Sequence, residues 1–383
     1  MALYDSFDSK SPEDSSSRLL FFWYPTRKAP RLKMRLSALI FAAVAEAQFN
    51  LQGLNHLRFG CEQITIERLD PLVNPGQAPT PHMHQVVGGN AFNASMPSAD
   101  ISKLATCTTC GPADDFSNYW TANLYFKARN GTYKRVPQKP NRLLFGDRFT
   151  TQTNGGVTVY YIAPGKGKVT AFQPGFRMLV GDPTRREPLY KSQSCFRCFS
   201  GPNYQGDNAA PCSDNRLDFE GFPNIPCLGG IRSNVLYPTC WDGKNLDSPN
   251  HQDHVSYPSQ GPSTFLTTAD CPASHPVKIP QLMLEIIWDT TQFNNEAEWP
   301  EDGSQPFVLS TGDPTGYGQH GDYVFGWKDD ALQRAMDDNG CFSATCGNQK
   351  SQDISVAQQC KIDKTVLEDV DGWLTELPGV PMS

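Results

Sequence analysis

The segment QLMLEIIWD at residues 281–289 is typical of a β-strand. It begins after Pro280, carries Ile286, Ile287 and Trp288, and ends at an aspartate, so β-branched and aromatic residues are bounded by residues that favour turns. Strand-like character of the same kind recurs along the chain. It predicts five further strands, at residues 63–69, 123–129, 157–163, 176–181 and 307–310.

Helical signals are confined to the C-terminal part of the chain. They predict helices at residues 328–339, before Gly340, and then at residues 354–359 and 365–374. No helix alternates with the strands, which argues against a doubly wound parallel sheet. We therefore expect a mainly β protein: a β-sandwich of jelly-roll type with long disulfide-stapled loops and short C-terminal helices.

The composition is that of a loop-rich, exported globular protein. The chain carries a net charge of -7, is 38% hydrophobic, and contains 31 glycines, 31 prolines and 12 cysteines. The acidic balance argues against a nucleic-acid partner. The absence of a long apolar run argues against a membrane span in the mature chain. We expect a monomer.

Residues 33–47 resemble a secretory signal in their order of properties. A charged start is followed by an apolar run and by small residues that end at Ala47. We expect a signal peptide at residues 34–47, cleaved after Ala47. Residues 1–33 are then the disordered product of an over-extended gene model, or alternatively a helix that packs on the core. Residues 48–383 would form a single β-sandwich domain.

The cysteines agree with export, because all 12 follow the expected cleavage site and their number is even. Up to six disulfides are expected. The pairs at residues 107–110 and 195–198 leave a zinc ribbon open as an alternative. Residues 194–276 hold six of the cysteines and predict a covering loop fixed by bridges. Two sequons, at Asn93 and Asn130, predict a glycoprotein.

Five of the seven histidines lie in three short segments rich in Gly, Pro and Asp: PHMHQ (81–85), NHQDH (250–254) and GQHGD (318–322). Imidazole binds transition metals in its neutral form, so clustered histidines indicate a shared task. We expect at least three of them to form one site for zinc, copper or manganese, with Asp253 or Asp322 as a ligand or as an acceptor for a ring N–H. The candidate metal ligands are His82, His84, His251, His254 and His320.

The histidine segments belong to longer motifs, which together resemble the fungal secreted family catalogued as domain of unknown function 1996. The resemblance covers residues 57–378. It implies secretion and frequent association with WSC-type cell-wall carbohydrate modules, and it implies no defined activity. The motifs are RFGC (58–61), RLDPLVNPG (68–76), PHMHQVVGGNAF (81–92), CWDG (240–243), residues 247–257 and GDPTGYGQHGD (312–322).

Three chemistries fit these residues. A metal held by three histidines, with one position open, would activate water or a sugar hydroxyl. A lyase would use His84 or a tyrosine as the base and Arg177 to neutralise a uronate carboxylate. A glycoside hydrolase would use two carboxylates, for which the candidates are Asp242, Asp247, Glu285, Asp289, Asp313 and Asp322.

Across these alternatives, the catalytic candidates are His84, His254, His320, Asp242, Asp322 and Tyr257, and the substrate-binding candidates are Arg177, Trp241, Trp327 and Tyr317. The sequence thus favours a secreted enzyme that hydrolyses or lyses a cell-wall or plant polysaccharide in a histidine-lined cleft that can hold a metal. The alternative is a non-catalytic extracellular wall or carbohydrate-binding protein with a structural histidine cluster. Removal of the metal distinguishes the two, because a structural metal supports stability alone.

Overall fold

The computed structural model describes residues 55–139, 155–165, 167–188, 193–202, 204–206, 210–261, 270–338, 341–343, 346 and 348–380. All of these residues belong to one compact unit that spans residues 46–383. The expected signal peptide at 34–47 and the preceding residues 1–33 lie outside the described residues.

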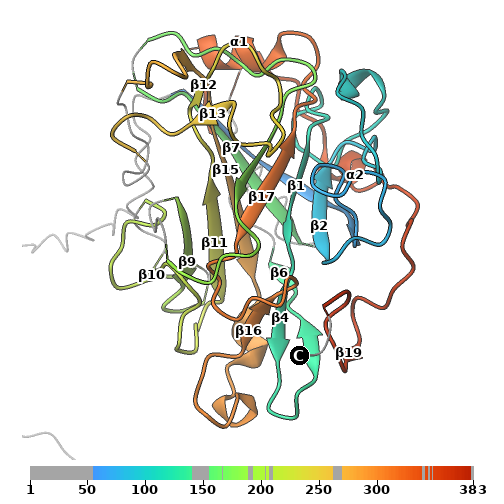
Figure 1. Cartoon of the computed structure of the whole chain (residues 1–383), viewed down its shortest axis with the longest axis vertical. Coiled ribbons are helices and arrows are strands. Elements are labelled where there is room, and N and C mark those ends of the chain that lie inside the picture. The colour runs from blue at the N-terminus through green and yellow to red at the C-terminus, as the bar shows by residue number, and fades with distance from the viewer. Residues whose placement is uncertain are drawn as a thin grey trace, which may run out of the picture. The chain divides into compact units, whose positions relative to one another are not determined.

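Most strands belong to one large, almost wholly antiparallel sheet (Figure 1). Its order is β10 (Asp218–Phe219), β9 (Ser194–Cys198), β11 (Ile231–Leu236), β15 (Gln281–Trp288), β7 (Gly156–Ile162), β1 (His56–Glu67), β2 (His84–Gly88), β3 (Asn118–Ala122), β17 (His320–Val324) and β8 (Arg177–Gly181). Two short strands join it from the side: β18 (Phe342–Ser343) pairs with β1 in parallel, and β6 (Gln138–Lys139) pairs with β15.

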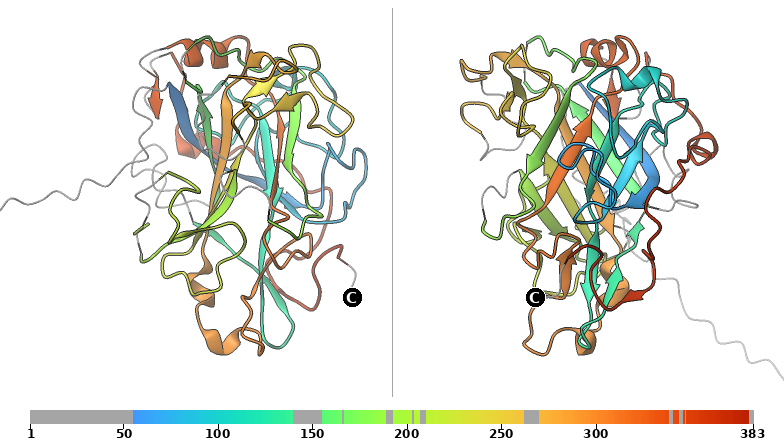
Figure 2. Two further views of the ribbon diagram at one scale, coloured as in Figure 1. Left: turned by 60° about the vertical axis from the view of Figure 1, so that its left-hand side comes forward. Right: turned by 45° about the vertical axis from the view of Figure 1, so that its right-hand side comes forward.

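Two smaller sheets lie outside this path. One contains β13 (Val255–Ser256), β12 (Cys240–Trp241) and β14 (Val277–Lys278). The other contains β16 (Phe307–Leu309), β4 (Leu124–Lys127), β5 (Tyr133–Arg135) and β19 (Trp373–Leu374). In both views of Figure 2, helix α1 (Ala331–Asp337) lies at one end of the long strands and the β4–β16 pair at the other.

Strand β1 is the point at which the large sheet folds back on itself. Its first half pairs with β7 and its second half with β2, and the register shifts between Gln63 and Thr65. Such a bulge bends a strand and increases its twist. We call the strands from β10 to β7 the first half-sheet and those from β2 to β8 the second half-sheet. Their inner faces share one hydrophobic core, which confirms the predicted mainly β architecture; the strand order is compatible with a jelly roll.

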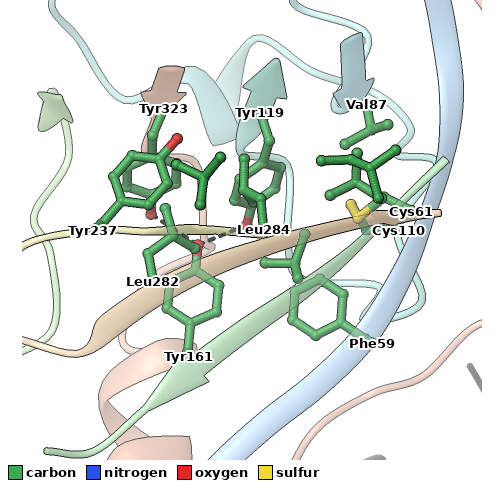
Figure 3. Packing of buried hydrophobic residues seen from close by; sticks show 14 of the residues in the cluster. Phe59, Cys61, Val87, Cys110, Tyr119, Tyr161, Tyr237, Leu282, Leu284 and Tyr323 are labelled. Atoms are coloured by element: carbon green, nitrogen blue, oxygen red, sulfur yellow. Dashed lines mark hydrogen bonds between the residues drawn. A yellow bond between two sulfur atoms is a disulfide. The ribbon is translucent and has the colours of Figure 1, made fainter. Parts of the chain in front are cut away.

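The centre of this core is a row of buried tyrosines (Figure 3). The hydroxyl of Tyr161, on β7, lies 2.6 Å from that of Tyr119 on β3 and 2.9 Å from that of Tyr323 on β17. Tyr119 donates its hydrogen to the buried carboxylate of Asp115 at 2.8 Å. Each hydroxyl has a single hydrogen, so the chain runs from Tyr323 through Tyr161 and Tyr119 to Asp115. Three bulky rings therefore fill the core while their hydroxyls stay hydrogen-bonded.

All six predicted strands are present, as β1, β4, β7, β8, β15 and β16. The covering-loop prediction for residues 194–276 is wrong in part, because this stretch supplies β9, β10 and β11 to the first half-sheet. These strands were not predicted because they contain polar residues, which interrupt the apolar pattern typical of a strand. Arg197 and Asp218 are fully buried and pair with each other at 2.6 Å, so a charged residue occupies an interior position of the sheet.

All 12 cysteines form disulfides, as predicted. The bridges are Cys61–Cys110, Cys107–Cys360, Cys195–Cys212, Cys198–Cys227, Cys240–Cys271 and Cys341–Cys346. Both C-x-x-C pairs are therefore divided among different bridges, which removes the zinc-ribbon alternative. Three of the bridges close loops of 17 to 31 residues within residues 195–271.

Two of the three predicted helices are present, as α1 and α2 (Ile354–Ala357). The helix predicted at residues 365–374 is wrong: this segment forms turns and ends in β19. The Asp369 side chain accepts hydrogen bonds from the backbone N–H groups of Asp371 and Gly372, which a helix over these residues would use for its own hydrogen bonds. Single 3₁₀ turns occur at Ile101–Lys103, Thr290–Phe293 and Glu296–Glu298.

No helix among the described residues is long and apolar enough to cross a membrane.

Candidate metal centre

The second half-sheet brings three of the predicted histidines together. Strand β3 lies between β2 and β17, and its register places His84 directly opposite Ala122. On the other side of β3, Gly321 lies opposite Thr121 in an antiparallel ladder, so His320, the residue before Gly321, also flanks Ala122. Because side chains alternate along a strand, His84 and His320 share the outer face of the half-sheet. The small Ala122 side chain leaves room for the two imidazoles to meet above it.

His82 completes the cluster from the segment just before β2. It lies two residues before His84, and the three rings have centroids 4.3 to 5.6 Å apart. Nε2 of His320 lies 3.3 Å from Nε2 of His82 and 3.4 Å from Nε2 of His84. Two nitrogens that each lie about 2.05 Å from a tetrahedral zinc ion are about 3.3 Å apart. The spacing therefore fits tetrahedral coordination. We call His82, His84 and His320 the histidine triad.

Backbone contacts fix the ring tautomers. Nδ1 of His84 donates to the carbonyl oxygen of Leu69 at 2.9 Å, and Nδ1 of His320 donates to that of Gly318 at 3.0 Å. A neutral imidazole carries one hydrogen, so both Nε2 atoms hold a lone pair that points into the cluster. Lone pairs that face one another repel unless a cation lies between them. The triad could therefore hold a metal ion.

Burial keeps these rings neutral, which is the form that binds metals. It lowers the pKa of His84 to about 3, with a further contribution from His320, and it also lowers the pKa of His82 and of His320. His84 and His320 are at most 2% exposed, whereas His82 is partly exposed. His82 is therefore the member of the triad that has surface exposed to solvent.

Two local features hold His320 in place. Asp313 accepts hydrogen bonds from the N–H groups of Thr315 and Gly318 and thereby shapes the turn that leads into β17. Gly181, the last residue of β8, lies opposite His320 in the ladder with β17, and its φ is +86°. A Cβ there would lie 2.4 Å from the carbonyl oxygen of Gln319 and 2.8 Å from Cα of His320, so glycine is required beside the triad.

Asp322 lies two residues after His320, on the same face of β17. It is fully buried, and within the described structure neither of its carboxylate oxygens has a hydrogen-bond partner. Burial raises the pKa of Asp322 well above its ordinary value, and the nearby carboxylate of Asp70 adds to the effect. Sequence reasoning had named Asp322 but had overlooked Asp70, whose only signal was its place in the RLDPLVNPG motif.

The other two predicted ligands do not join the triad. His251 binds the carboxylate of Asp247 through Nδ1 at 2.6 Å and the carbonyl of Leu72 through Nε2 at 3.1 Å. Both partners are acceptors, so the ring carries two hydrogens, and its pKa is raised chiefly by the hydrogen bond to Asp247. His254 bonds to the Ser248 hydroxyl and donates from Nε2 to the carbonyl of Arg177. Each ring lacks a lone pair that is free for a metal.

The predicted lyase residues also have other partners. Arg177 is buried, donates to the carbonyl of Pro97 at 2.7 Å and lies 3.8 Å from Asp247. The Tyr257 hydroxyl donates to the carbonyl of Leu236, and burial raises the pKa of this hydroxyl above its ordinary value. Tyr317 lines a cleft that is described below.

The predicted aromatic platform is mostly core. Trp327 is fully buried against Phe59 and Tyr161. Trp241 is 6% exposed, and its indole N–H donates to the carbonyl of Asn245.

The remaining carboxylate candidates have structural partners. Asp242 caps a turn by accepting from the N–H groups of Lys244 and Asn245. Glu285 lies between Arg58 and Arg232, at 3.7 and 3.6 Å, and Asp289 pairs with Lys139. Among the carboxylates considered, Asp322 therefore stands apart. The second group with suitable donor atoms, Cys61, Cys110 and Asp115, includes two disulfide sulfurs, which are not thiolate ligands.

A cleft of about 900 Å³ opens where the two half-sheets meet at their free edges. Its walls come from β8, β11, β13 and the segments before β9 and β17. His251 and His275 line it, whereas the triad does not, so the predicted histidine-lined cleft and the histidine cluster are separate features. They are close neighbours, because the cleft residues Gly181 and Gln319 directly adjoin His320.

Fold and site together define a disulfide-stapled β protein with a buried three-histidine cluster beside an open cleft. The chain belongs to the family described as domain of unknown function DUF1996, which matches residues 70–327. This range contains the whole triad, Asp70 and Asp322. No curated protein and no solved structure matches the chain.

Proposed function

We propose that the protein is a secreted metalloprotein whose histidine triad holds zinc, copper or manganese, and that it acts on a cell-wall or plant polysaccharide. The convergence of Nε2 atoms at 3.3 and 3.4 Å, with Nδ1 of two rings held by backbone carbonyls, carries the proposal. Imidazole ligands favour zinc and copper over the harder cations. Three protein ligands leave the fourth tetrahedral position open, and a metal bound in this way would supply an activated water.

The cleft beside the triad suits a carbohydrate chain. Tyr257 and Tyr317 offer aromatic surface, and several serine, asparagine and glutamine side chains offer hydrogen bonds. Four carboxylates, Asp182, Glu187, Glu220 and Asp253, share the lining with one arginine, Arg185. Such a lining repels a polyuronate. Because Arg177 is also committed to Asp247, we favour hydrolysis of a neutral or cationic glycan over lyase-type cleavage.

A second function is supported by a different observation. His84 and His320 are almost completely buried, as ligands of a structural metal usually are. In this alternative the protein is a non-catalytic wall or carbohydrate-binding protein. The metal would then stabilise the second half-sheet by tying β2 to β17 across β3.

The export part of the proposal rests on the expected signal peptide and on the disulfides. Six bridges and no free thiol are compatible with an oxidising, extracellular environment. Asn93 and Asn130, the predicted glycan acceptors, are both exposed. We propose that the mature chain is a monomer with a glycan partner and without a nucleic-acid or membrane partner.

Chelation separates the two functions. The purified, secreted protein is screened on neutral, cationic and uronate polysaccharides, before and after dialysis against a strong chelator and after zinc, copper or manganese is restored. We expect cleavage of a neutral or cationic glycan that chelation abolishes and one metal restores. If chelation lowers only the melting temperature and no glycan is cleaved, the non-catalytic alternative holds. Cleavage that persists without metal would contradict a metal-dependent mechanism.

A further inference from the structure

Asp322 is a buried carboxylate without a counter-charge or a hydrogen-bond donor in the described structure. It has no exposed surface, and both of its oxygens are unpartnered. Burying such a group without compensation is strongly unfavourable. The other buried carboxylates around the triad are compensated: Asp313 accepts three hydrogen bonds at 2.6 to 2.8 Å, and Asp70 accepts two backbone hydrogen bonds at 3.1 Å.

Asp322 has a neighbour across the sheet that carries an unpartnered donor. Trp120 is its register partner on β3, and it projects from the same face of the half-sheet. The indole N–H of Trp120 is buried and has no hydrogen-bond partner among the described residues either. A buried water that accepts from Trp120 and donates to Asp322 would satisfy both groups, and buried waters usually make about three such contacts. The oxygen of this water would keep a lone pair for a third contact.

A carboxylate near a metal site usually accepts the second N–H of a metal-binding imidazole, but in this protein backbone carbonyls accept it from two of the rings. Metal-binding imidazoles generally donate their second N–H to a carboxylate or a carbonyl. In this protein the carbonyls of Leu69 and Gly318 accept those hydrogens from His84 and His320. These two rings therefore do not need Asp322 for their orientation, and Asp322 accepts a hydrogen bond from no ring in the described structure. It also lies outside the group of ligand atoms that are within 4.8 Å of one another, so it does not coordinate directly.

The balance of charges around the triad also indicates that Asp322 compensates the charge of a bound cation. Three neutral imidazoles and a divalent cation carry two positive charges. Asp322 and Asp70, both at most 2% exposed, supply two negative charges, while the third buried carboxylate, Asp313, lies 3.5 Å from Arg186. Asp70 is close enough to interact electrostatically with His82, His320 and Asp322. With a cation in place, the buried cluster is neutral.

We propose that Asp322 is the buried counter-charge of a metal held by the histidine triad, and that it acts on the metal's open position through a water shared with Trp120. Asp322 is thus a positioning residue. The inference rests on the proposed metal site. It assigns to Asp322 the role of setting the metal affinity of that site and the surroundings of the open coordination position.

The test uses the full secreted chain and the variants Asp322→Asn and Trp120→Phe. Calorimetry measures the zinc affinity of each protein. The visible absorption spectrum is recorded for the cobalt-substituted proteins, and the melting temperature is measured for the metal-free proteins. Asp322→Asn is expected to weaken zinc binding about 10- to 100-fold and to shift the cobalt bands. The melting temperature of the metal-free variant should equal or exceed that of the wild type, because an unpaired buried carboxylate has been removed. Trp120→Phe, which keeps the ring but lacks the N–H, is expected to shift the cobalt bands in the same direction.

Asp115→Asn is the matched control, since Asp115 is an equally buried carboxylate in the tyrosine row of the inner core. It is expected to leave zinc affinity and the cobalt spectrum unchanged. Wild-type zinc affinity and an unchanged cobalt spectrum in Asp322→Asn would overturn this inference while leaving the metal site intact. A lowered melting temperature of metal-free Asp322→Asn would also overturn it, as the sign of a purely structural role. A wild-type chain that binds neither zinc nor cobalt would instead refute the proposed metal site itself.

Discussion

At the scale of single residues, the contact from Nδ1 of His84 to the carbonyl of Leu69 decides which nitrogen is left for a metal. The corresponding contact of His320 with Gly318 does the same. By contrast, both nitrogens of His251 and of His254 are used by other partners. Five histidines with similar sequence surroundings therefore divide into three whose Nε2 atoms converge and two whose ring nitrogens are bound by other groups. This division depends in part on backbone carbonyls far along the chain, those of Leu69 for His84, Leu72 for His251 and Arg177 for His254, which no local pattern encodes.

Asp115 gives a prediction about pH. Burial raises its pKa to about 7 from an ordinary value of 3.8. Between these two values the folded protein holds a proton that the unfolded chain releases, so the free energy of unfolding decreases as the pH rises from about 4 to about 7. We expect Asp115→Asn to remove this part of the pH dependence, a difference on the order of a few kcal/mol.

Denaturation of both proteins at pH 4.5 and pH 7.5 measures the effect. The difference between wild type and variant isolates Asp115 from the other titrating groups, since they remain in both proteins. Parallel pH profiles would show that the tyrosine row compensates the ionised carboxylate fully.

At the scale of elements, the strands that could be predicted are those whose apolar residues dominate, such as β15 and β7. Strands β9, β11 and β17 could not be predicted, because their interior positions carry Arg197, Asn234 and Asp322. A buried polar residue has the same sequence signature as a solvent-exposed one until its partner is known. The failed helix at residues 365–374 has a different cause, since the Asp369 side chain accepts from the backbone N–H groups of Asp371 and Gly372 that a helix would use.

Gly181→Ala tests how β8 positions the triad. The added Cβ would meet the carbonyl of Gln319 at 2.4 Å and Cα of His320 at 2.8 Å, at a backbone φ of +86°. We expect a loss of stability of about 1–3 kcal/mol together with weaker zinc binding, because His320 must move. Melting temperature and zinc calorimetry report the two effects separately.

Gly131→Ala is the matched control, because Gly131 has φ of +85° but no atom within 4 Å of an added Cβ. The Gly131→Ala variant places an alanine at a positive φ, as Gly181→Ala does, but the added Cβ meets no other atom. Residue 131 also lies far along the sequence from the triad. Equal zinc affinity in the wild type and Gly181→Ala would show that β8 does not hold His320 in position.

At the scale of the whole molecule, the triad joins residues that are 238 positions apart, through a sheet that folds back at β1. The sequence indicated the chemistry, because five of the seven histidines fall in three short segments. It could not indicate that one intervening strand, β3, would bring β2 and β17 to either side of Ala122. The sequence likewise predicted that the clustered histidines line a cleft. The cleft lies beside the histidine triad instead, at the place where the edges of the two half-sheets meet.

The metal content of the secreted protein tests the central claim most directly. Wild type, His84→Ala and His275→Ala are purified from culture medium, incubated with zinc, dialysed and analysed by mass spectrometry of metals. His275 lines the cleft and lies outside the triad, so its variant controls for the loss of a histidine in general. We predict one zinc ion per chain in wild type and His275→Ala, and no retained zinc in His84→Ala, whose stability changes by less than about 2 kcal/mol without metal. A wild-type chain without bound metal, or a His84→Ala chain that keeps it, would contradict the account.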